Sequence, residues 1–199
     1  VMIDTCQRVP DVIFGALAPA VPDRIIAGCN GACTTVIFTG SLPDTTDRFY
    51  IYHEAIAGGS GASKHGDGLS GVQVHMTNTT NMEMEFPIVT IKCYELWKDS
   101  GGPGAHRGGL GIHREFEIMG EGVTLNTYGE RQALPPWGLN GGMDGKGGEF
   151  WRITPDGKRT RIPTKQTGMR LDKGDIVEVR TPGSGGYGDP KSRDPQRVL

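Results

Sequence analysis

The stretch Phe86-Pro-Ile-Val-Thr-Ile-Lys-Cys-Tyr-Glu-Leu-Trp97 decides the fold class of this chain. Two sets of side chains alternate along it, beginning with Ile88, Thr90 and Lys92 on one side and with Val89, Ile91 and Cys93 on the other. A period of two residues is that of a β-strand, in which successive side chains point to opposite faces. The stretch therefore predicts a strand, although neither of its faces is cleanly polar.

Further short strands are predicted on both sides of this stretch. β-branched and aromatic residues dominate six more segments, each bounded by turn-forming residues: 34–38, 48–57, 112–118, 123–128, 149–154 and 175–180. The tetrapeptide Pro155-Asp-Gly-Lys158 predicts a hairpin turn between the segments on either side of it. The last two-thirds of the chain is therefore expected to be mainly β.

One short helix is predicted near the start of the chain. In Asp11-Val-Ile-Phe-Gly-Ala-Leu-Ala18 the apolar residues fall on one side of a helix, with Pro10 acceptable in the first turn and Pro19 as a stop. We therefore expect a single α+β domain over residues 1–199, mainly β, with many glycine-rich turns and a short N-terminal helix.

Composition limits the partners and the location. The 199 residues carry 21 basic and 23 acidic side chains, a net charge of -2, so nucleic acid, which needs a concentrated positive surface, is a poor candidate partner. No apolar run approaches the ~20 residues that cross a bilayer, which predicts no membrane association. Four scattered cysteines do not suit a disulfide framework and favour a reducing compartment, so we expect a cytoplasmic protein.

Glycine is the unusual component, with 32 of 199 residues, more than twice its average share of about 7%. Residues 58–71 mix glycine with polar side chains, which predicts a loop that runs over a surface or lines a cleft. In 101–111 and 183–188 we expect glycines to supply positive φ angles where strands reverse, with Arg107 bonding carbonyl groups there. Residues 101–111 lack the Gly-Lys-Ser/Thr ending and the following helix of a phosphate-binding loop, which excludes that interpretation.

Four glycine-containing segments occur in the order typical of one family: Ile56-Ala-Gly-Gly-Ser-Gly-Ala62, Gly68-Leu-Ser-Gly-Val-Gln-Val-His-Met-Thr-Asn-Thr79, Asp99-Ser-Gly-Gly-Pro-Gly-Ala-His-Arg-Gly-Gly-Leu-Gly111 and Thr181-Pro-Gly-Ser-Gly-Gly-Tyr-Gly-Asp-Pro190. They resemble the hydantoinase B and 5-oxoprolinase C-terminal family, which includes N-methylhydantoinase B and the acetone or acetophenone carboxylase-type subunits. Thr5-Cys-Gln-Arg8 and Pro135-Pro-Trp-Gly-Leu-Asn-Gly-Gly142 extend the resemblance over essentially the whole chain. It identifies residues 1–199 as a C-terminal domain or part-domain of that family.

The resemblance implies a component of an ATP-dependent cyclic amidase that opens hydantoin, 5-oxoproline or lactam rings. Its expected partners in a hetero-oligomer are a hydantoinase A-type ATP-binding subunit, which holds the ATP, and the N-terminal half of a hydantoinase B-type subunit. The metal-ligand signature of the family, a His-x-x-Asp stretch followed by a His-rich stretch, has no counterpart in this sequence. We therefore expect a divalent metal whose ligands lie outside this chain, and no metal ligand within it.

Two alternatives remain open. The chain is either a subunit of an ATP-dependent acetone or acetophenone-type carboxylase, or a non-catalytic assembly module of such a complex. Hydrolysis and carboxylation pass through oxyanion-like states that are stabilised by the same kinds of donors and metal ions. The hydrolase is preferred because the motifs are shared by the whole family, and the small-molecule substrate is expected to be an amide or a ketone.

Two residues are candidates for catalysis. His75 shares a predicted strand face with Gln73 and Thr77, and an imidazole suits carbonyl polarisation or proton transfer near neutral pH. Its alternative role is a hydrogen bond that anchors residues 58–71. Glu54 lies near a predicted strand end where side chains often face a cleft, and it becomes a general base only if burial raises its pKa.

The candidate substrate-binding residues are Asn78, Thr79 and Asn81, together with Gly58 and Gly59. Amide and hydroxyl groups orient a substrate amide or ketone, although Asn and Thr are also ordinary turn residues.

Three further sets of residues received structural interpretations. His65 and Asp67 have the residue types of a metal site without a zinc spacing, so surface polar residues are favoured. Cys29 and Cys33 lack a second ligand pair, which favours two buried or half-buried thiols. Trp137 either caps an apolar pocket or, in the favoured interpretation, anchors an interface.

Overall fold

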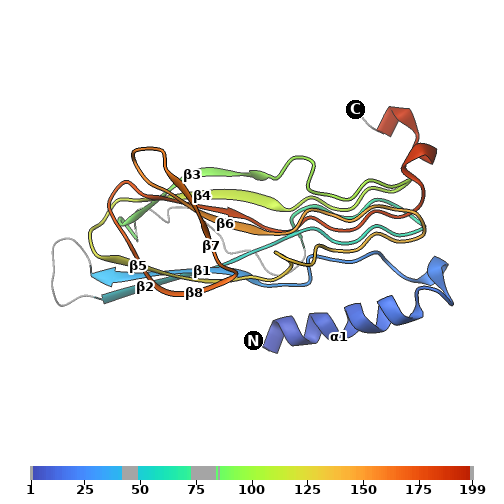
Figure 1. Ribbon diagram of the computed structural model, residues 1–199, viewed down its shortest axis with the longest axis horizontal. Coiled ribbons are helices and arrows are strands. Elements are labelled where there is room, and N and C mark those ends of the chain that lie inside the picture. The colour runs from blue at the N-terminus through green and yellow to red at the C-terminus, as the bar shows by residue number, and fades with distance from the viewer. Residues whose placement is uncertain (1, 42–48, 73–83, 85, 198–199) are drawn as a thin grey trace.

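The protein contains two antiparallel β-sheets, as shown by a computed structural model that describes residues 2–41, 49–72, 84 and 86–197 (Figure 1). The four-stranded sheet has the order β2-β1-β5-β8, with bounds Thr34–Ser41 for β1, Phe49–Ile56 for β2, Val123–Tyr128 for β5 and Lys165–Leu171 for β8. The five-stranded sheet has the order β3-β4-β9-β6-β7, with bounds Val89–Leu96, Ile112–Ile118, Ile176–Arg180, Glu149–Ile153 and Arg159–Ile162. The α+β, mainly β class predicted from the sequence is confirmed.

The two sheets form a sandwich whose core comes from one face of each strand. In β4 the alternation buries Ile112, Arg114, Phe116 and Ile118 and leaves the residues between them half-exposed. The ring of Phe116 lies 5.3 Å from that of Phe38 in β1, so the aromatic contact joins the two layers. Burying one such side chain contributes about 1.5 to 3 kcal/mol, which makes this apolar interior the main source of stability in this half of the molecule.

The predicted strands are present, with ends that differ by up to three residues. The hairpin at residues 155–158 is confirmed, because β6 and β7 pair directly across it. Strand β8 was not predicted. Its pairing with β5 is interrupted between Leu125 and Thr127, and Asn126 Oδ1 accepts the backbone N–H of Gly168, whose φ is +66°. Because of this irregularity, apolar and polar residues do not alternate regularly along residues 165–171, so the sequence lacks the usual signal of a strand.

The N-terminal helix α1 spans Met2–Leu17, so the prediction of a helix starting at residue 11 was wrong about its beginning. Tertiary contacts hold the earlier turns: Asp4 Oδ1 accepts the N–H of Cys33 at 2.8 Å, and Arg8 Nη2 donates to the carbonyl oxygen of Asn30 at 2.9 Å. Pro10 lies inside the helix, where it removes one hydrogen-bond donor without ending the helix.

Helix α1 turns its charged face toward the rest of the molecule. Asp4 and Asp11 are buried, and Asp11 pairs with Arg131 at 2.5 Å, whereas Val12 is 70% exposed. The apolar side predicted from the sequence therefore points away from the core. Within the described ranges, no helix has both the length and the apolar character needed to cross a bilayer.

Beyond the sheets, extended segments outside any named strand run side by side and form what we call the glycine bundle (Figure 1). It consists of residues 25–33, 57–72, 98–111, 136–148 and 181–189. Its central segment, 181–187, is buried throughout and bonds to all four of the others. These bonds are Gly185 N to Gly28 O, Ala62 N to Gly185 O, Gly102 N to Ser184 O and Gly183 N to Lys146 O. A sheet strand has at most two hydrogen-bonded neighbours, so the bundle extends in three dimensions.

Close approach of backbones, and not turn geometry, explains most of these glycines. A Cβ at Gly185 would lie 1.8 Å from the carbonyl oxygen of Trp137, and one at Gly183 would lie 1.9 Å from that of Ser100. Of the described glycines in 101–111 and 183–188, Gly188 alone has a positive φ, so the predicted role in strand reversal was wrong. Residues 58–71 were predicted to run over a surface or line a cleft, but Gly58, Gly59, Ala62 and Gly68 are buried, so the surface alternative was wrong for these four residues.

An ion pair between Asp67 and Arg193 stabilises the far end of the bundle. Asp67 Oδ1 and Oδ2 accept from Nη1 and Nη2 of Arg193, each at 2.8 Å, and Oδ1 also accepts the backbone N–H of Arg107. The hydrogen bonds from Arg193 are the main reason why the pKa of Asp67 falls to about 2. This contact fixes the C-terminal turns η2 (Pro190–Ser192) and η3 (Pro195–Arg197) on the bundle. Another short turn, η1 (Pro22–Arg24), follows α1.

Candidate functional site

Glu54 lies in the interior between the two sheets and not at a cleft. It is on the inner face of β2, where its Oε1 lies 2.5 Å from Nη1 of Arg114 on β4, and both side chains are 0% exposed. The hydroxyl of Tyr52 donates to Glu54 Oε2 at 2.5 Å. Burial raises the pKa of Glu54, while the charge of Arg114 and the bond from Tyr52 act in the opposite direction. The expectation that Glu54 faces a cleft is wrong, and its role as a general base stays a prediction.

Arg114 completes this buried cluster. Its guanidinium carbon lies 4.4 Å from the ring centroid of Tyr94 and 5.0 Å from that of Phe116, which places aromatic faces against the cation. Among the described residues, its Nε and Nη2 have no hydrogen-bond acceptor. A metal cation does not fit beside Glu54, because the arginine already supplies a positive charge in contact with the carboxylate.

His75, Asn78, Thr79 and Asn81 lie outside the described residues. The described residues that flank them contact the neighbourhood of Glu54. The N–H of Val72 donates to the carbonyl oxygen of Gly58 at 3.0 Å, and the ring of Phe86 lies 5.0 Å from that of Tyr52. Val72 and Phe86 therefore lie beside the start of the glycine bundle and beside β2, respectively.

Gly58 and Gly59 are buried in the glycine bundle. A Cβ at Gly58 would lie 2.3 Å from Cγ of Asn30, and one at Gly59 would lie 2.2 Å from the carbonyl oxygen of Gly109. The carbonyl group of Gly59 accepts the N–H of Asn30 at 3.0 Å. Their described contacts are thus with protein backbone and side chains, and their role in substrate binding stays a prediction.

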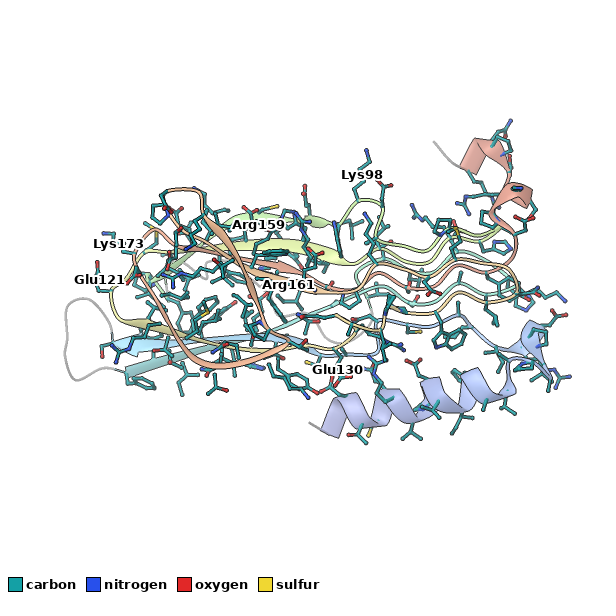
Figure 2. The ribbon with its side chains drawn as sticks, viewed as in Figure 1. Lys98, Glu121, Glu130, Arg159, Arg161 and Lys173 are labelled. Carbon is teal, nitrogen blue, oxygen red and sulfur yellow. The ribbon has the colours of Figure 1, made fainter. Side chains whose placement is uncertain are left out.

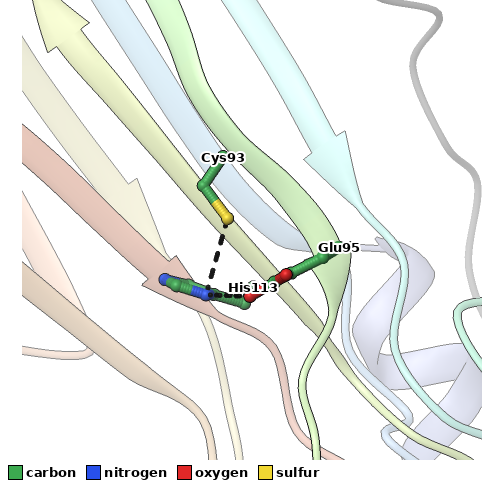
Figure 3. Close-up of side chains that lie close together, drawn as sticks. All are labelled: Cys93, Glu95 and His113. Carbon is green, nitrogen blue, oxygen red and sulfur yellow. Dashed lines mark hydrogen bonds and ion pairs between the residues drawn. The ribbon is translucent and has the colours of Figure 1, made fainter.

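A second polar cluster lies on the outer face of the five-stranded sheet (Figure 3). His113 of β4 contacts two residues of β3, with its Nδ1 3.7 Å from Cys93 Sγ and 3.1 Å from Glu95 Oε1. Its Nε2 lies 3.2 Å from Glu115 Oε1 and 3.4 Å from Glu178 Oε1. Each half of this cluster offers three atoms of metal-ligating types within 4.8 Å of one another.

Sequence reasoning missed the outer cluster, since its members come from three strands. One signal was present: Cys93 and Glu95 are two residues apart, as are His113 and Glu115, so each pair shares a face of its strand. This signal was incomplete, because strict alternation puts Cys93 and Glu95 on the face of Ile91, and His113 lies on the opposite face.

An open cavity of about 370 Å³ lies between α1 and the end of β5. Glu130 projects into the space between the sheet and the helix, where its Oε2 lies 3.4 Å from Nε of Arg8 (Figure 2). Burial, together with Asp4 and Glu130, raises the pKa of Tyr128 to about 12. The lining residues are Asp4, Thr5, Arg8, Val9, Val12, Ile13, Tyr128 and Glu130.

The other candidates have structural surroundings. Cys29 is buried and accepts the N–H of Gly61, Cys33 is half-buried, and both are free thiols, as expected. The Trp137 ring packs against Gly28 of the bundle and lies close to Gly15 of α1.

Comparison with known proteins assigns the family. The sequence profile described as hydantoinase B/oxoprolinase matches residues 1–190. The chain belongs to this family. A 5-oxoprolinase of Arabidopsis thaliana is 35% identical over 92% of the chain, which corresponds to 14% of that protein. The chain spans between 14% and 34% of the length of the curated relatives that it matches first.

Two solved structures share the fold of this family member. ATP-dependent caprolactamase from Pseudomonas jessenii superposes with a TM-score of 0.78 at 28% identity, over 92% of this chain and 34% of that one. Nucleotide-free acetone carboxylase superposes with a TM-score of 0.74 at 20% identity, over 92% of this chain and 29% of that one. In both, the matching part belongs to a chain about three times longer.

Proposed function

We propose that this chain is a component of an ATP-dependent cyclic amide hydrolase. It works with a hydantoinase A-type ATP-binding subunit and with the N-terminal half of a hydantoinase B-type subunit. The similarity to caprolactamase carries this proposal. The chain is 28% identical in sequence to caprolactamase but only 20% identical to acetone carboxylase, and the lower identity supports a shared fold alone. The 35% identity to a plant 5-oxoprolinase points to the same class of substrate.

The segment around His75 is proposed to form a polar wall of the substrate site. The observation that supports this role is the placement of its flanking residues, Val72 and Phe86, against Gly58 and Tyr52, which bracket Glu54 in the sequence. Asn78, Thr79 and Asn81 would orient the amide of the substrate through neutral hydrogen bonds.

In this proposal His75 carries a proton to or from the ring that is opened. Glu54 is the second catalytic candidate; burial raises its pKa, while the charge of Arg114 and the hydrogen bond from Tyr52 oppose this rise. No step is assigned to a metal ion on this side of the molecule, since Arg114 occupies the place beside Glu54.

The substitution His75→Ala tests this role. We expect the assembled complex to lose turnover at least about tenfold, because general acid-base catalysis by one side chain contributes that much or more. Complex integrity, followed by size-exclusion chromatography, should not change. His65→Ala is the matched control, since His65 is exposed in the turn between Ser63 and Gly66, and it should retain full turnover. Equal activity of the His75→Ala and wild-type complexes would remove His75 from the site.

The alternative of an assembly module is favoured by one observation, the exposed apolar side of α1. Val12 is 70% exposed and Ile13 49%, so this surface suits coverage by another part of a larger protein. Removing the chain from the complex distinguishes the two functions. Residual turnover by the separated remaining chains would support the module, whereas a complete loss that is also produced by His75→Ala in the intact complex supports the hydrolase.

A further inference from the structure

A β-bulge creates the outer cluster. Strand β3 pairs with β4 so that Ile91 lies opposite Phe116 but Cys93 lies opposite Glu115, which leaves Lys92 as an extra residue. Without this shift, the side chains of Cys93 and Glu95 would point to the inner face of the sheet, as the side chain of Ile91 does. The extra residue turns both to the outer face, beside His113. Bulges commonly re-aim side chains in this way.

The two separations from His113 are close to those around a tetrahedral ion, and all three atoms lie within 4.8 Å of one another. Zinc bonds of about 2.3 Å to sulfur and 2.0 to 2.2 Å to nitrogen and oxygen imply ligand separations of about 3.3 to 3.6 Å. The Nδ1 atom of His113 lies 3.7 Å from Cys93 Sγ and 3.1 Å from Glu95 Oε1 (Figure 3). Glu95 is an exposed side chain, so a small movement of its carboxylate adjusts the third ligand.

The other nitrogen of His113 has the surroundings of a metal-bound imidazole. When Nδ1 binds an ion, Nε2 carries the proton, and metal-bound histidines donate this proton to a carboxylate or carbonyl group. Nε2 of His113 lies 3.2 Å from Glu115 Oε1 and 3.4 Å from Glu178 Oε1, within ion-pair distance, although neither described contact has hydrogen-bond geometry. Glu178 is itself fixed, since Arg180 Nε lies 2.5 Å and Arg159 Nη2 2.7 Å from its carboxylate. This second layer of contacts would hold the ring in position.

The local charge also suits a cation. Glu95 and Glu115 lie beside His113, together with Glu178, which is already paired with Arg159 and Arg180. The carboxylates of Glu95 and Glu115 repel one another. A divalent ion would relieve this repulsion and allow the thiolate to form.

We propose that Cys93, Glu95 and His113 form a binding site for a zinc-class divalent ion that clips the edge strand β3 to β4. The thiolate and imidazole ligands select a borderline-soft ion over magnesium or calcium. The site has three protein ligands and one position for water or a group from another chain. It is independent of the proposed hydrolase, whose catalytic residues lie elsewhere in the chain.

Cobalt(II) is a direct probe of this site, because a bound thiolate gives a ligand-to-metal charge-transfer band. The full chain, freed of metal by a chelator, is titrated with Co²⁺ under reducing conditions. We expect one ion per chain and a charge-transfer band that Zn²⁺ abolishes by displacement. Cys93→Ser should remove the band, and Cys6→Ser, which changes an exposed thiol on α1, should keep it.

Calorimetric titration with Zn²⁺ tests the other ligands. Glu95→Gln and His113→Asn should each weaken binding by at least about tenfold, the lower bound for loss of even an outer-shell partner. Glu117→Gln is the matched control, because it removes a carboxylate from the same face of β4 that is paired with Lys92 and is not a ligand. At pH 7, binding should release about one proton per ion, because an ordinary thiol, with a pKa of about 8.5, must lose its proton to bind a metal.

Circular dichroism of the metal-free variants establishes that each is folded before its titration is interpreted. Glu95 is exposed, so Glu95→Gln leaves the core intact. The proposal is overturned if the wild-type chain shows no saturable binding, or if its cobalt spectrum is the same after Cys93→Ser.

Discussion

Gly185→Ala is expected to lower the free energy of unfolding by at least about 3 kcal/mol, the upper part of the range for overpacked interiors. The new Cβ would lie 1.8 Å from the carbonyl oxygen of Trp137, which belongs to backbone and cannot swing away. Gly185 also donates to Gly28 and accepts from Ala62, so moving it disturbs two further segments. Urea denaturation followed by circular dichroism measures the change.

Gly66→Ala is the control for this substitution. Gly66 closes the turn that starts at Ser63, where a Cβ would meet nothing within 4 Å, and its φ is not positive. Alanine there should be neutral or stabilise by up to about 1 kcal/mol through the unfolded state. Similar free energies of unfolding for the Gly185→Ala and Gly66→Ala proteins would contradict the close-packed bundle.

Arg114→Leu is expected to destabilise the protein by about 3 to 5 kcal/mol, the cost of leaving one member of a buried ion pair without its partner. Glu54 would remain 0% exposed with Tyr52 as its described hydrogen-bond donor. The carboxyl group would take up a proton, and Arg114 would no longer stack against Tyr94. The shift in the urea midpoint at constant slope reports this change.

Two further variants separate the ion pair from its surroundings. The double substitution Glu54→Leu with Arg114→Leu should recover much of the loss, because apolar replacements of a whole buried pair are often neutral. Lys64→Ala breaks the exposed pair with Asp23, which solvent screens, and should leave the free energy of unfolding nearly unchanged. A stability loss for Arg114→Leu as small as that for Lys64→Ala would show that the pair is not buried as described.

The strands of the sandwich were predictable because their signal is local. In residues 112–118 the alternation of apolar and polar residues is visible in the sequence and appears unchanged as the burial pattern of β4. Arg114 falls on the apolar side of that alternation. A buried arginine requires an anionic partner, and Glu54, which the sequence offered only as a general base, supplies it in the fold.

The glycine bundle was not predictable in the same way. A glycine required for a positive φ and one required for the approach of another backbone look alike in a sequence. At Gly185 the reason is the Trp137 carbonyl, a contact between residues far apart in the chain. The outward orientation of the apolar side of α1 has a related cause, since Asp11 is held by Arg131, a partner 120 residues away.

The outer cluster depended on a single extra residue. Strict alternation along β3 would have put Cys93 and Glu95 on the side of Ile91, away from His113. Bulges leave no regular mark in the sequence of one chain, so the grouping became visible only in the fold.

The most direct test of the central claim is a substrate assay on the purified complex that contains this chain. ATP is supplied with 5-oxoproline, hydantoin or caprolactam in one series, and with acetone or acetophenone and bicarbonate in another, and both ADP and organic product are measured. We predict ring-opened product with a cyclic amide, formed together with ADP. Carboxylated ketone and ADP, with no ring opening of any amide, would contradict the assignment as a cyclic amide hydrolase.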